Sequence, residues 1–331
     1  MKVKVFLESA GNFEERDILK SFYEGIKKYE NTNSDVFTEL LTVDWALDTA
    51  YENCDVAVIL GSWKDRSRTH HITRNAVVRS APVFIVVETP LLGRVMFEKS
   101  KHHRIGINGF LNNSGTFRVS KHNNDRLQKL GIEWNGWKEN PGGDILLLLQ
   151  LPGDASLRNI DIYDFGRWAV KKIREVSNKK IIVRTHPGHN PKGLDEVHRF
   201  ISDITLLDDK NITVRVGSRE KTLDQDLANA YCTISYSSGS SIDSIVAGVP
   251  TIALDPGNFA YGISSNYIEH IDKDKLRRAD TKDVQQWLND LSYSQWSVEE
   301  MRNGKVWSHL KPIIDEKIIE ALTNRKGKGK K

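Results

Sequence analysis

Short apolar runs alternate with helical patterns along most of this chain. In the first half, apolar runs predict strands at 3–7, 56–60 and 83–87, and the spacing of apolar residues predicts a helix over 14–29. From 104 to 137 the pattern is irregular and rich in Gly and Asn, which predicts surface loops. Strands that alternate with helices form a parallel sheet covered by helices, so we expect an α/β unit here.

The same alternation restarts near residue 145. Apolar runs predict strands at 145–150, 181–184, 213–216, 233–236 and 251–254. Helical periodicity predicts helices at 162–176, 223–230, 280–291 and 298–322. The second half is therefore also expected to be an α/β unit with parallel strands.

A linker is expected between the two halves. Residues 137–144 contain a Pro and two Gly and lead directly into an apolar strand. We therefore predict two domains, C-terminal helices and a basic tail, with the boundaries 1–138, 139–290, 291–322 and 323–331. Ligands of such sheets bind beyond the carboxyl ends of the strands, so the loops there are expected to face a cleft between the domains.

The loop after the strand at 233–236 is the best candidate for binding an anion. It consists of Ser237, Ser238, Gly239, Ser240 and Ser241, and a short helix follows. Backbone N–H groups and hydroxyls at a helix N-terminus form a phosphate site, which we favour over a flexible loop. Asp243 follows in the helix, where its carboxylate either complements the helix dipole or accepts hydrogen bonds from ribose hydroxyls.

Further polar groups follow other strands of the second half. Arg184 and His186 end the strand at 181–184 and are predicted to donate to a diphosphate, although His186 is alternatively a helix cap. Gln150 ends the strand at 145–150, and Gly153 lies in the turn that follows. This turn either lets the backbone approach a ligand closely or is a plain turn. The segment 255–258, from Asp255 to Asn258, follows the last strand and either lines the sugar pocket or forms a turn.

In the first half the candidate catalytic group is Glu88. It follows the strand at 83–87, where a carboxylate facing the cleft accepts a proton from an acceptor hydroxyl. Asp44 and Asp65 are competing bases, and an exposed turn acid is the structural alternative for Glu88.

Composition describes a soluble globular protein. The hydrophobic and charged fractions are 39% and 28%, and no apolar run is long enough to span a bilayer. The first residues fit a strand better than a signal peptide, so we expect a cytoplasmic protein. Cys54 and Cys232 lie beside predicted strands and are expected to be buried, reduced thiols, and neither has the spacing of a metal ligand.

The charge balance adds a possible partner. The net charge is +4, and the basic end 325–331 contributes to it as either a solubilising tail or a contact for nucleic acid. Lys64, Arg66 and Arg68 belong to a basic first half, which favours an acidic macromolecule as acceptor.

Three segments resemble the nucleotide-binding domain of GT-B glycosyltransferases, including sialyl- and Kdo-transferases: 184–187, 237–241 and 247–251. The whole chain, with the segments 106–110 and 147–153, is similar to glycosyltransferase-like proteins of tailed phages. Asp243 stands where GT-B enzymes often carry a Glu in the ribose-binding helix.

The resemblance implies two Rossmann-like domains that face each other across a cleft, with 1–138 as the acceptor-binding domain and 139–290 as the nucleotide-sugar-binding domain. It also implies that the protein transfers a sugar from a nucleoside diphosphate sugar, with a UDP-sugar as the expected donor. It implies no tightly bound cofactor and no required divalent metal. The implied acceptor is 5-hydroxymethylpyrimidine, such as hydroxymethylcytosine, in duplex phage DNA. Its expected contacts are Asn108, Asn112, Lys64, Arg66 and Arg68.

Other functions remain open from the sequence. The acceptor is alternatively a polysaccharide or a glycolipid. A non-catalytic protein that binds nucleotide sugars or nucleic acid would use the same fold, because fold does not imply activity. A nucleotide-sugar epimerase is a further alternative.

Overall fold

The computed structural model describes residues 1–8, 13–43, 53–61, 77–93, 102–118, 121–187, 194–217, 221–272 and 275–328. The chain divides into two compact units. The first unit comprises Met1–Phe110, Ser114–Arg126 and Leu288–Lys331, and the second comprises Leu111–Asn113 and Leu127–Trp287. The C-terminal segment thus belongs to the same unit as the N-terminus. The sequence analysis places the corresponding boundaries at residues 138 and 290.

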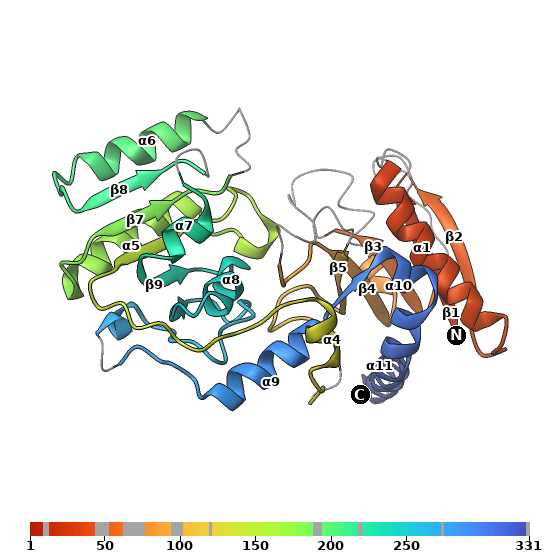
Figure 1. The fold of residues 1–331 in the computed structure, drawn as a ribbon. Helices are drawn as coiled ribbons and strands as arrows, with labels where there is room; N and C mark the ends of the chain where they lie inside the picture. Colours follow the sequence, from red (N-terminus) through yellow and green to blue (C-terminus); the bar gives the residue numbers. More distant parts are fainter. Residues whose placement is uncertain are drawn as a thin grey trace. The chain divides into compact units, whose positions relative to one another are not determined.

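The first unit is built on a six-stranded sheet with the order β11-β5-β4-β3-β1-β2 (Figure 1). Its strands are β1 (Lys2–Glu8), β2 (Phe37–Val43), β3 (Val56–Leu60), β4 (Val83–Glu88), β5 (His102–Ile107) and β11 (Gln295–Ser297). The strands β1 to β4 pair in parallel, whereas β5 is antiparallel to both β4 and β11. The order 2-1-3-4-5 of the first five strands is that of a doubly wound sheet.

Helices of the first unit bury apolar stripes against this sheet. They are α1 (Phe13–Glu30), α10 (Val298–Arg302) and α11 (Lys305–Lys328). Two further helices, α4 (Asp125–Lys129) and α9 (Thr281–Ser292), lie where the chain changes unit. In α1, Ile18, Phe22 and Ile26 recur at helical spacing and are buried. Gly25 is required because a Cβ there would lie 1.9 Å from the carbonyl oxygen of Met301 in α10.

The second unit is built on a five-stranded sheet with the order β10-β9-β6-β7-β8, in which all pairs are parallel. Its strands are β6 (Asp144–Leu148), β7 (Ile181–Arg184), β8 (Ile212–Arg215), β9 (Ala230–Ser235) and β10 (Thr251–Ala253). When these five strands are numbered 1 to 5 in chain order, their order in the sheet is 5-4-1-2-3, which is a Rossmann arrangement. The order in which strands are added to the sheet reverses direction between β6 and β9. That topological switch point is the expected ligand position in such sheets.

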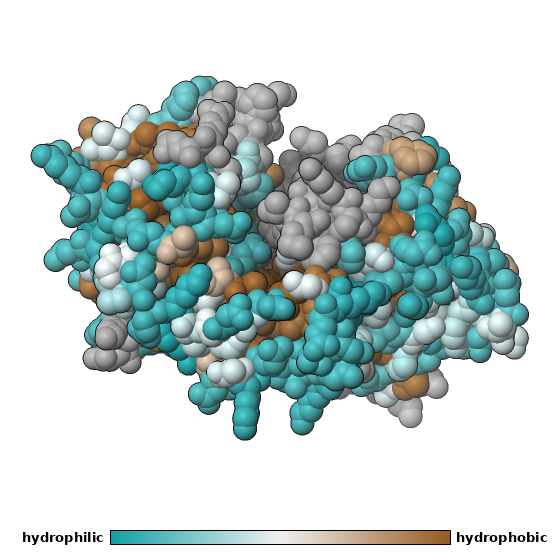
Figure 2. All heavy atoms as spheres, viewed as in Figure 1, coloured by the Kyte–Doolittle hydropathy of each residue, from teal (hydrophilic) through white to brown (hydrophobic). Residues whose placement is uncertain are grey.

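Helices cover both faces of the second sheet. The helices α5 (Ile162–Val176) and α6 (Leu194–Thr205) share one apolar cluster, and α7 (Leu223–Leu227) contributes to a separate cluster on the other face (Figure 1). The helix α8 (Ser240–Val246) follows β9, and the 3-10 turns η1 (Ala155–Leu157) and η3 (Ile268–Ile271) complete the unit. The face of this unit shown in Figure 2 is mostly hydrophilic.

The predicted fold class is confirmed, while several elements differ from the sequence-based expectation. The stretch 105–117 was expected to form loops, yet 105–107 lies in β5, whose sequence HHRIGI has no apolar alternation. The expected helix 298–322 is two helices, because the chain breaks at Asn303 and at Gly304, where φ is +83°. The elements β2, α4, α6 and β11 lacked a prediction.

The cysteine prediction is confirmed. Cys54 and Cys232 are free and buried. Burial raises the pKa of the Cys54 thiol to about 11 and that of the Cys232 thiol to about 12. Among the helices within the described ranges, none is both long and apolar enough to cross a membrane.

Candidate functional site

The candidate site lies at the carboxyl edge of the second sheet. Five segments follow strands that end there: 149–161 after β6, 185–187 after β7, 216–217 after β8, 236–239 after β9 and 254–260 after β10. The segments after β6 and β9 flank the switch point between these two strands. Ligands of open α/β sheets bind at such a point, so the polar groups there are the first to consider.

A buried amide bridges the two segments at the switch point. The Gln150 side chain accepts a hydrogen bond from the backbone N–H of Ser237 at 2.9 Å and donates to Ser156 Oγ at 2.6 Å. The Ser237 hydroxyl in turn donates to the Ser156 carbonyl at 2.9 Å. Gln150 and Ser237 are both buried, so they join the two segments and form the floor of the candidate site.

The side chain of Asn258 holds the serine-rich turn in place through hydrogen bonds. Its side chain is fully buried, and its Nδ2 lies 2.9 Å from Ser241 Oγ, 3.2 Å from Ser235 Oγ and 3.2 Å from the Tyr236 carbonyl. The hydroxyls of Ser235 and Ser241 are also 2.6 Å apart. The turn therefore has one defined conformation set by a hydrogen-bonded network, which a flexible loop would not have.

The serine-rich turn divides into buried and accessible parts. Ser237, Ser238 and Ser241 are buried, whereas Gly239 and Ser240 are half-buried. The Ser238 hydroxyl donates to Ser240 Oγ at 3.0 Å and accepts from the Ser240 N–H at 3.2 Å. The accessible part is thus narrower than the five residues predicted from the sequence. Asp243 is half-buried within the first turn of the seven-residue α8.

His186 and Arg184 have different surroundings, although both follow from the same strand. His186 is half-buried beyond the end of β7. The Arg184 guanidinium is buried, donates to the Lys221 carbonyl at 3.0 Å and forms an ion pair with Asp226. Arg184 thus ties β7 to the segment around α7, and only His186 of this pair reaches the accessible edge.

The segment after β6 contains three residues in left-handed conformation. They are Gly153, Arg158 and Asn159, with φ values of +72°, +51° and +79°. Gly153 is exposed, and no atom lies near the position that a Cβ would take. Asp154 accepts from the N–H and the hydroxyl of Ser156 at 2.8 and 2.6 Å and thereby fixes the start of η1.

Asp255 is held by this segment. Its buried carboxylate accepts from the Gly257 N–H at 2.6 Å and forms an ion pair with the exposed Arg158 guanidinium. Burial, together with the negative charge of Asp255, raises the pKa of the Tyr236 hydroxyl. Asp255 is thus an anchored structural acid whose neighbours Arg158 and Tyr236 are the more accessible groups.

Two predicted acceptor contacts, Asn108 and Asn112, belong to different units. Asn112 belongs to the second unit, where its N–H donates to the Gly257 carbonyl at 3.0 Å and its side chain to the Pro256 carbonyl at 3.3 Å. Asn108 belongs to the first unit and adopts a left-handed conformation with φ of +60°. Its side-chain Oδ1 accepts a hydrogen bond from the backbone N–H of Phe84 at 2.9 Å. Phe84 lies at the start of β4.

Glu88 ends β4 at the edge opposite to Asn108. Its carboxylate is 3.8 Å from the Arg104 guanidinium and accepts from the Thr89 N–H at 3.2 Å. Glu88 lies four positions after Phe84, which corresponds to about 13 Å along the strand at the usual rise per residue. Asn108 and Glu88 therefore do not share a site. The remaining predicted residues, Lys64, Arg66, Arg68, Asp44 and Asp65, lie outside the described residues.

Three site residues were missed by the sequence analysis: Ser156, Tyr236 and Asp226. Asn258 lies in the candidate segment 255–258 but was given no role of its own. Tyr236 directly precedes Ser237, and this proximity was the only sequence signal for it. No group of three or more His, Cys, Asp or Glu side chains placed to hold a metal ion is found in the described part of the chain.

Comparison with known proteins identifies the fold. No protein-family model and no curated protein matches the chain. The solved structure of the Thermosulfurimonas dismutans KpsC β-Kdo 2,4 transferase matches with a TM-score of 0.50 and 13% identity, over 88% of this chain and 89% of that one. The KpsC β-Kdo 2,7 transferase from the same organism matches with a TM-score of 0.50 and 13% identity, over 93% and 99% of the two chains.

A third match is weaker. The UDP-GlcNAc 2-epimerase of Methanocaldococcus jannaschii, in complex with UDP-GlcNAc and UDP, covers 96% of this chain and 100% of its own at 15% identity and a TM-score of 0.36. The two transferase matches place the chain in the GT-B fold class, with two Rossmann-like α/β units. Neither of them is named as a phage or DNA-modifying enzyme, so the DNA acceptor gains no support from them.

Proposed function

We propose that this protein is a glycosyltransferase that moves a sugar from a nucleotide-activated donor to a hydroxyl acceptor. The observation that carries the proposal is the switch point of the second sheet, where the buried Gln150–Ser237 bridge joins the segments after β6 and β9. Accessible polar groups flank it in a fold of the GT-B class, and the similarity to the Kdo transferases supports the same reading.

The donor phosphates bind beside the serine-rich turn. Gly239 contributes its backbone N–H and Ser240 its hydroxyl, and His186 donates from the end of β7. Such preorganised donors stabilise the negative charge that develops on the departing phosphate. The hydrogen bonds of Asn258 and Gln150 hold the turn in place before the donor arrives.

The chemistry requires a base in the first unit, and Glu88 is the proposed group. Its carboxylate takes the proton of the acceptor hydroxyl while that oxygen attacks the anomeric carbon. The bond from the anomeric carbon to the donor phosphate breaks, and the phosphate leaves with the electron pair. Direct displacement in one step inverts the configuration at the anomeric carbon.

The acceptor is proposed to be a hydroxyl group of a larger molecule. The resemblance to phage proteins implies 5-hydroxymethylpyrimidine in duplex DNA, whereas the two structurally similar KpsC enzymes are named as Kdo transferases. A base in a duplex would have to be flipped out of the stack to react. The test therefore needs a DNA arm and a glycan arm.

Transfer assays test the proposal. The protein is incubated with a panel of UDP-, GDP-, CDP- and CMP-activated sugars, each with hydroxymethylated duplex DNA or with an oligosaccharide mixture, and products are detected by mass spectrometry. At least one donor is expected to yield a glycosylated product. Nucleotide binding without transfer in any arm would favour a non-catalytic binding protein, and the absence of any nucleotide binding would refute the proposal.

Glu88→Gln tests the base, with Glu299→Gln as the matched control. Both changes neutralise one carboxylate of the first unit that is paired with an arginine, but Glu299 is an exposed residue of α10. Glu88→Gln is expected to lower kcat at least a hundredfold with unchanged donor affinity, in line with the usual size of general base catalysis. Equal activities of the two variants would remove Glu88 from the mechanism.

A further inference from the structure

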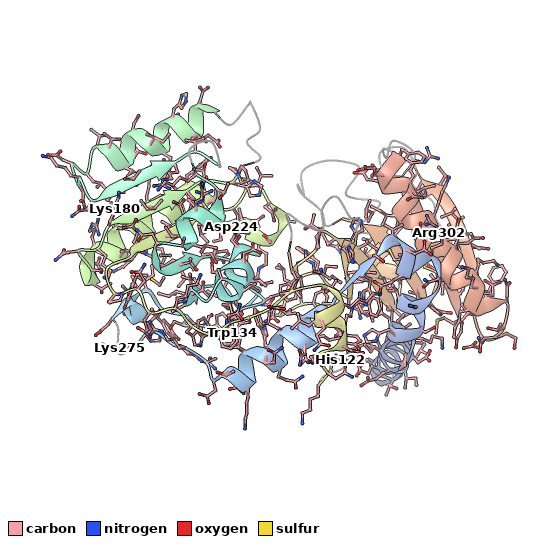
Figure 3. The ribbon with its side chains drawn as sticks, viewed as in Figure 1. His122, Trp134, Lys180, Asp224, Lys275 and Arg302 are labelled. Carbon is pink, nitrogen blue, oxygen red and sulfur yellow. The ribbon has the colours of Figure 1, made fainter. Side chains whose placement is uncertain are left out.

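The second unit contains a buried cluster of two arginines around one aspartate. Asp226 lies on α7, the helix marked by the labelled Asp224 in Figure 3. One oxygen of its buried carboxylate pairs with Nη1 of Arg184 and the other with Nη1 of Arg215. The exposed fractions of the three side chains are 4% for Asp226, 6% for Arg184 and 11% for Arg215. A single carboxylate thus separates two guanidinium groups that water hardly reaches.

The cluster lies directly behind the accessible edge. Arg184 and Arg215 are the last residues of β7 and β8 and are register partners in the sheet. Beyond them, the Thr185 N–H donates to the Arg215 carbonyl at 3.0 Å, and the Gly217 N–H donates to Thr185 Oγ1 at 3.0 Å. The chain reaches His186 one residue later. The position of His186 therefore follows from how the ends of β7 and β8 are held together.

We propose that Asp226 is a positioning residue for His186. Two buried like charges repel each other strongly unless an opposite charge lies between them. Asp226 supplies that charge and fixes both guanidiniums to α7, so the ends of β7 and β8 stay in register. The expected effect on nucleotide binding rests on the proposed function.

Asp226→Asn separates positioning from simple electrostatics, because the two effects have opposite signs. Removing a negative charge near an anion site would strengthen nucleotide binding if charge alone mattered. If Asp226 acts by positioning, the arginines move apart, His186 shifts and the dissociation constant of the donor nucleotide rises at least tenfold. Isothermal titration calorimetry with the best donor from the transfer assays, or with UDP, measures the change.

Asp209→Asn is the matched control. Asp209 also pairs with an arginine of the second unit, the half-buried Arg174, but at the amino ends of β7 and β8, near the Lys180 labelled in Figure 3. This variant removes the same charge and a similar ion pair at the opposite edge of the sheet. It is expected to bind nucleotide within about twofold of the parent protein.

A second readout needs no ligand. The imidazole Cε1–H resonance of His186, assigned with His186→Asn, is expected to shift or broaden in Asp226→Asn and to stay unchanged in Asp209→Asn. A folded Asp226→Asn protein with an unchanged His186 resonance would overturn the proposal even if the protein binds no nucleotide. Tighter nucleotide binding by this variant would overturn it as well.

Asp226→Glu replaces Asp226→Asn if the latter does not fold. It keeps the charge and displaces the two guanidiniums by one methylene, so it is expected to shift the same resonance and to weaken nucleotide binding. An unchanged resonance in a folded Asp226→Glu protein would contradict the proposal. If only the proposed function is wrong, the result is different. The parent protein then binds no nucleotide, but the His186 resonance still shifts or broadens in Asp226→Asn.

Discussion

Replacement of Asn258 by Ala tests the network that shapes the serine-rich turn. The Asn258 amide carries two N–H donors, and its closest acceptors are Ser241 Oγ at 2.9 Å and two further oxygens at 3.2 Å. The substitution removes two hydrogen bonds donated by the amide, at about 1 kcal/mol each. In the parent protein the Ala260 N–H donates to Asn258 Oδ1 at 3.0 Å, and the loss of this acceptor costs a further 1–3 kcal/mol, roughly. The expected loss of unfolding free energy is therefore about 3–5 kcal/mol.

Asn266→Ala provides the matched control. Asn266 is half-buried and donates to the carbonyls of Ala253 and Tyr261 at 3.0 and 3.1 Å, but it does not contact the turn. It is expected to lose about 1–2 kcal/mol and to retain nucleotide affinity. Urea unfolding followed by circular dichroism, with the transitions of the two units fitted separately, gives the stabilities, and calorimetric titration gives the affinity. The reasoning is refuted if Asn258→Ala costs less than Asn266→Ala or binds nucleotide as tightly as the parent.

Three further predictions concern the scaffold. Arg126→Met removes the ion-pair partner of the buried Glu300 carboxylate and is expected to cost about 3–5 kcal/mol in urea unfolding. The double variant Arg126→Met/Glu300→Leu should recover most of that loss, and equal stability of the two variants would contradict this. The raised pKa values of Cys54 and Cys232, about 11 and about 12, keep both thiols protonated near pH 8, so a thiol reagent should react at least tenfold more slowly with the folded protein than after denaturation. Burial lowers the pKa of His309 to about 4, with the charges of His122 and Arg126 adding to the effect, so its contribution to stability is complete above about pH 6.5 and is lost as the pH falls toward 4. His309→Phe should make unfolding free energy less dependent on pH in that window, and an unchanged slope would argue against it.

The sequence was sufficient for the fold class because the second half repeats clear apolar strands. Predicted and observed bounds agree fully for the helix at 162–176 and the strand at 181–184. The strands at the antiparallel end of the first sheet were harder to predict. The edge strand β11 and its neighbour β5 contain Gln, His and Arg in place of an apolar run, and they are recognisable only through their pairing with other strands. The helix α6 was missed although Val197, Phe200 and Ile204 follow helical spacing.

The candidate site was predictable in its location but not in the roles of its side chains. The sequence indicates that Arg184 and the serine-rich turn follow parallel strands, and the structure places both at one edge of the sheet. Whether a polar side chain points outward or into a network depends on partners distant in sequence. Arg184 meets Asp226, 42 residues away, and Ser237 meets Gln150, 87 residues away. No local pattern carries that information.

A crystal structure with a bound nucleotide sugar tests the central claim most directly. The account predicts the phosphate groups beside His186 and the backbone of Gly239 and Ser240, at the carboxyl edge of the sheet between β6 and β9. Nucleotide bound elsewhere on the second unit, or this edge left empty at a donor concentration that saturates binding in solution, would contradict the account.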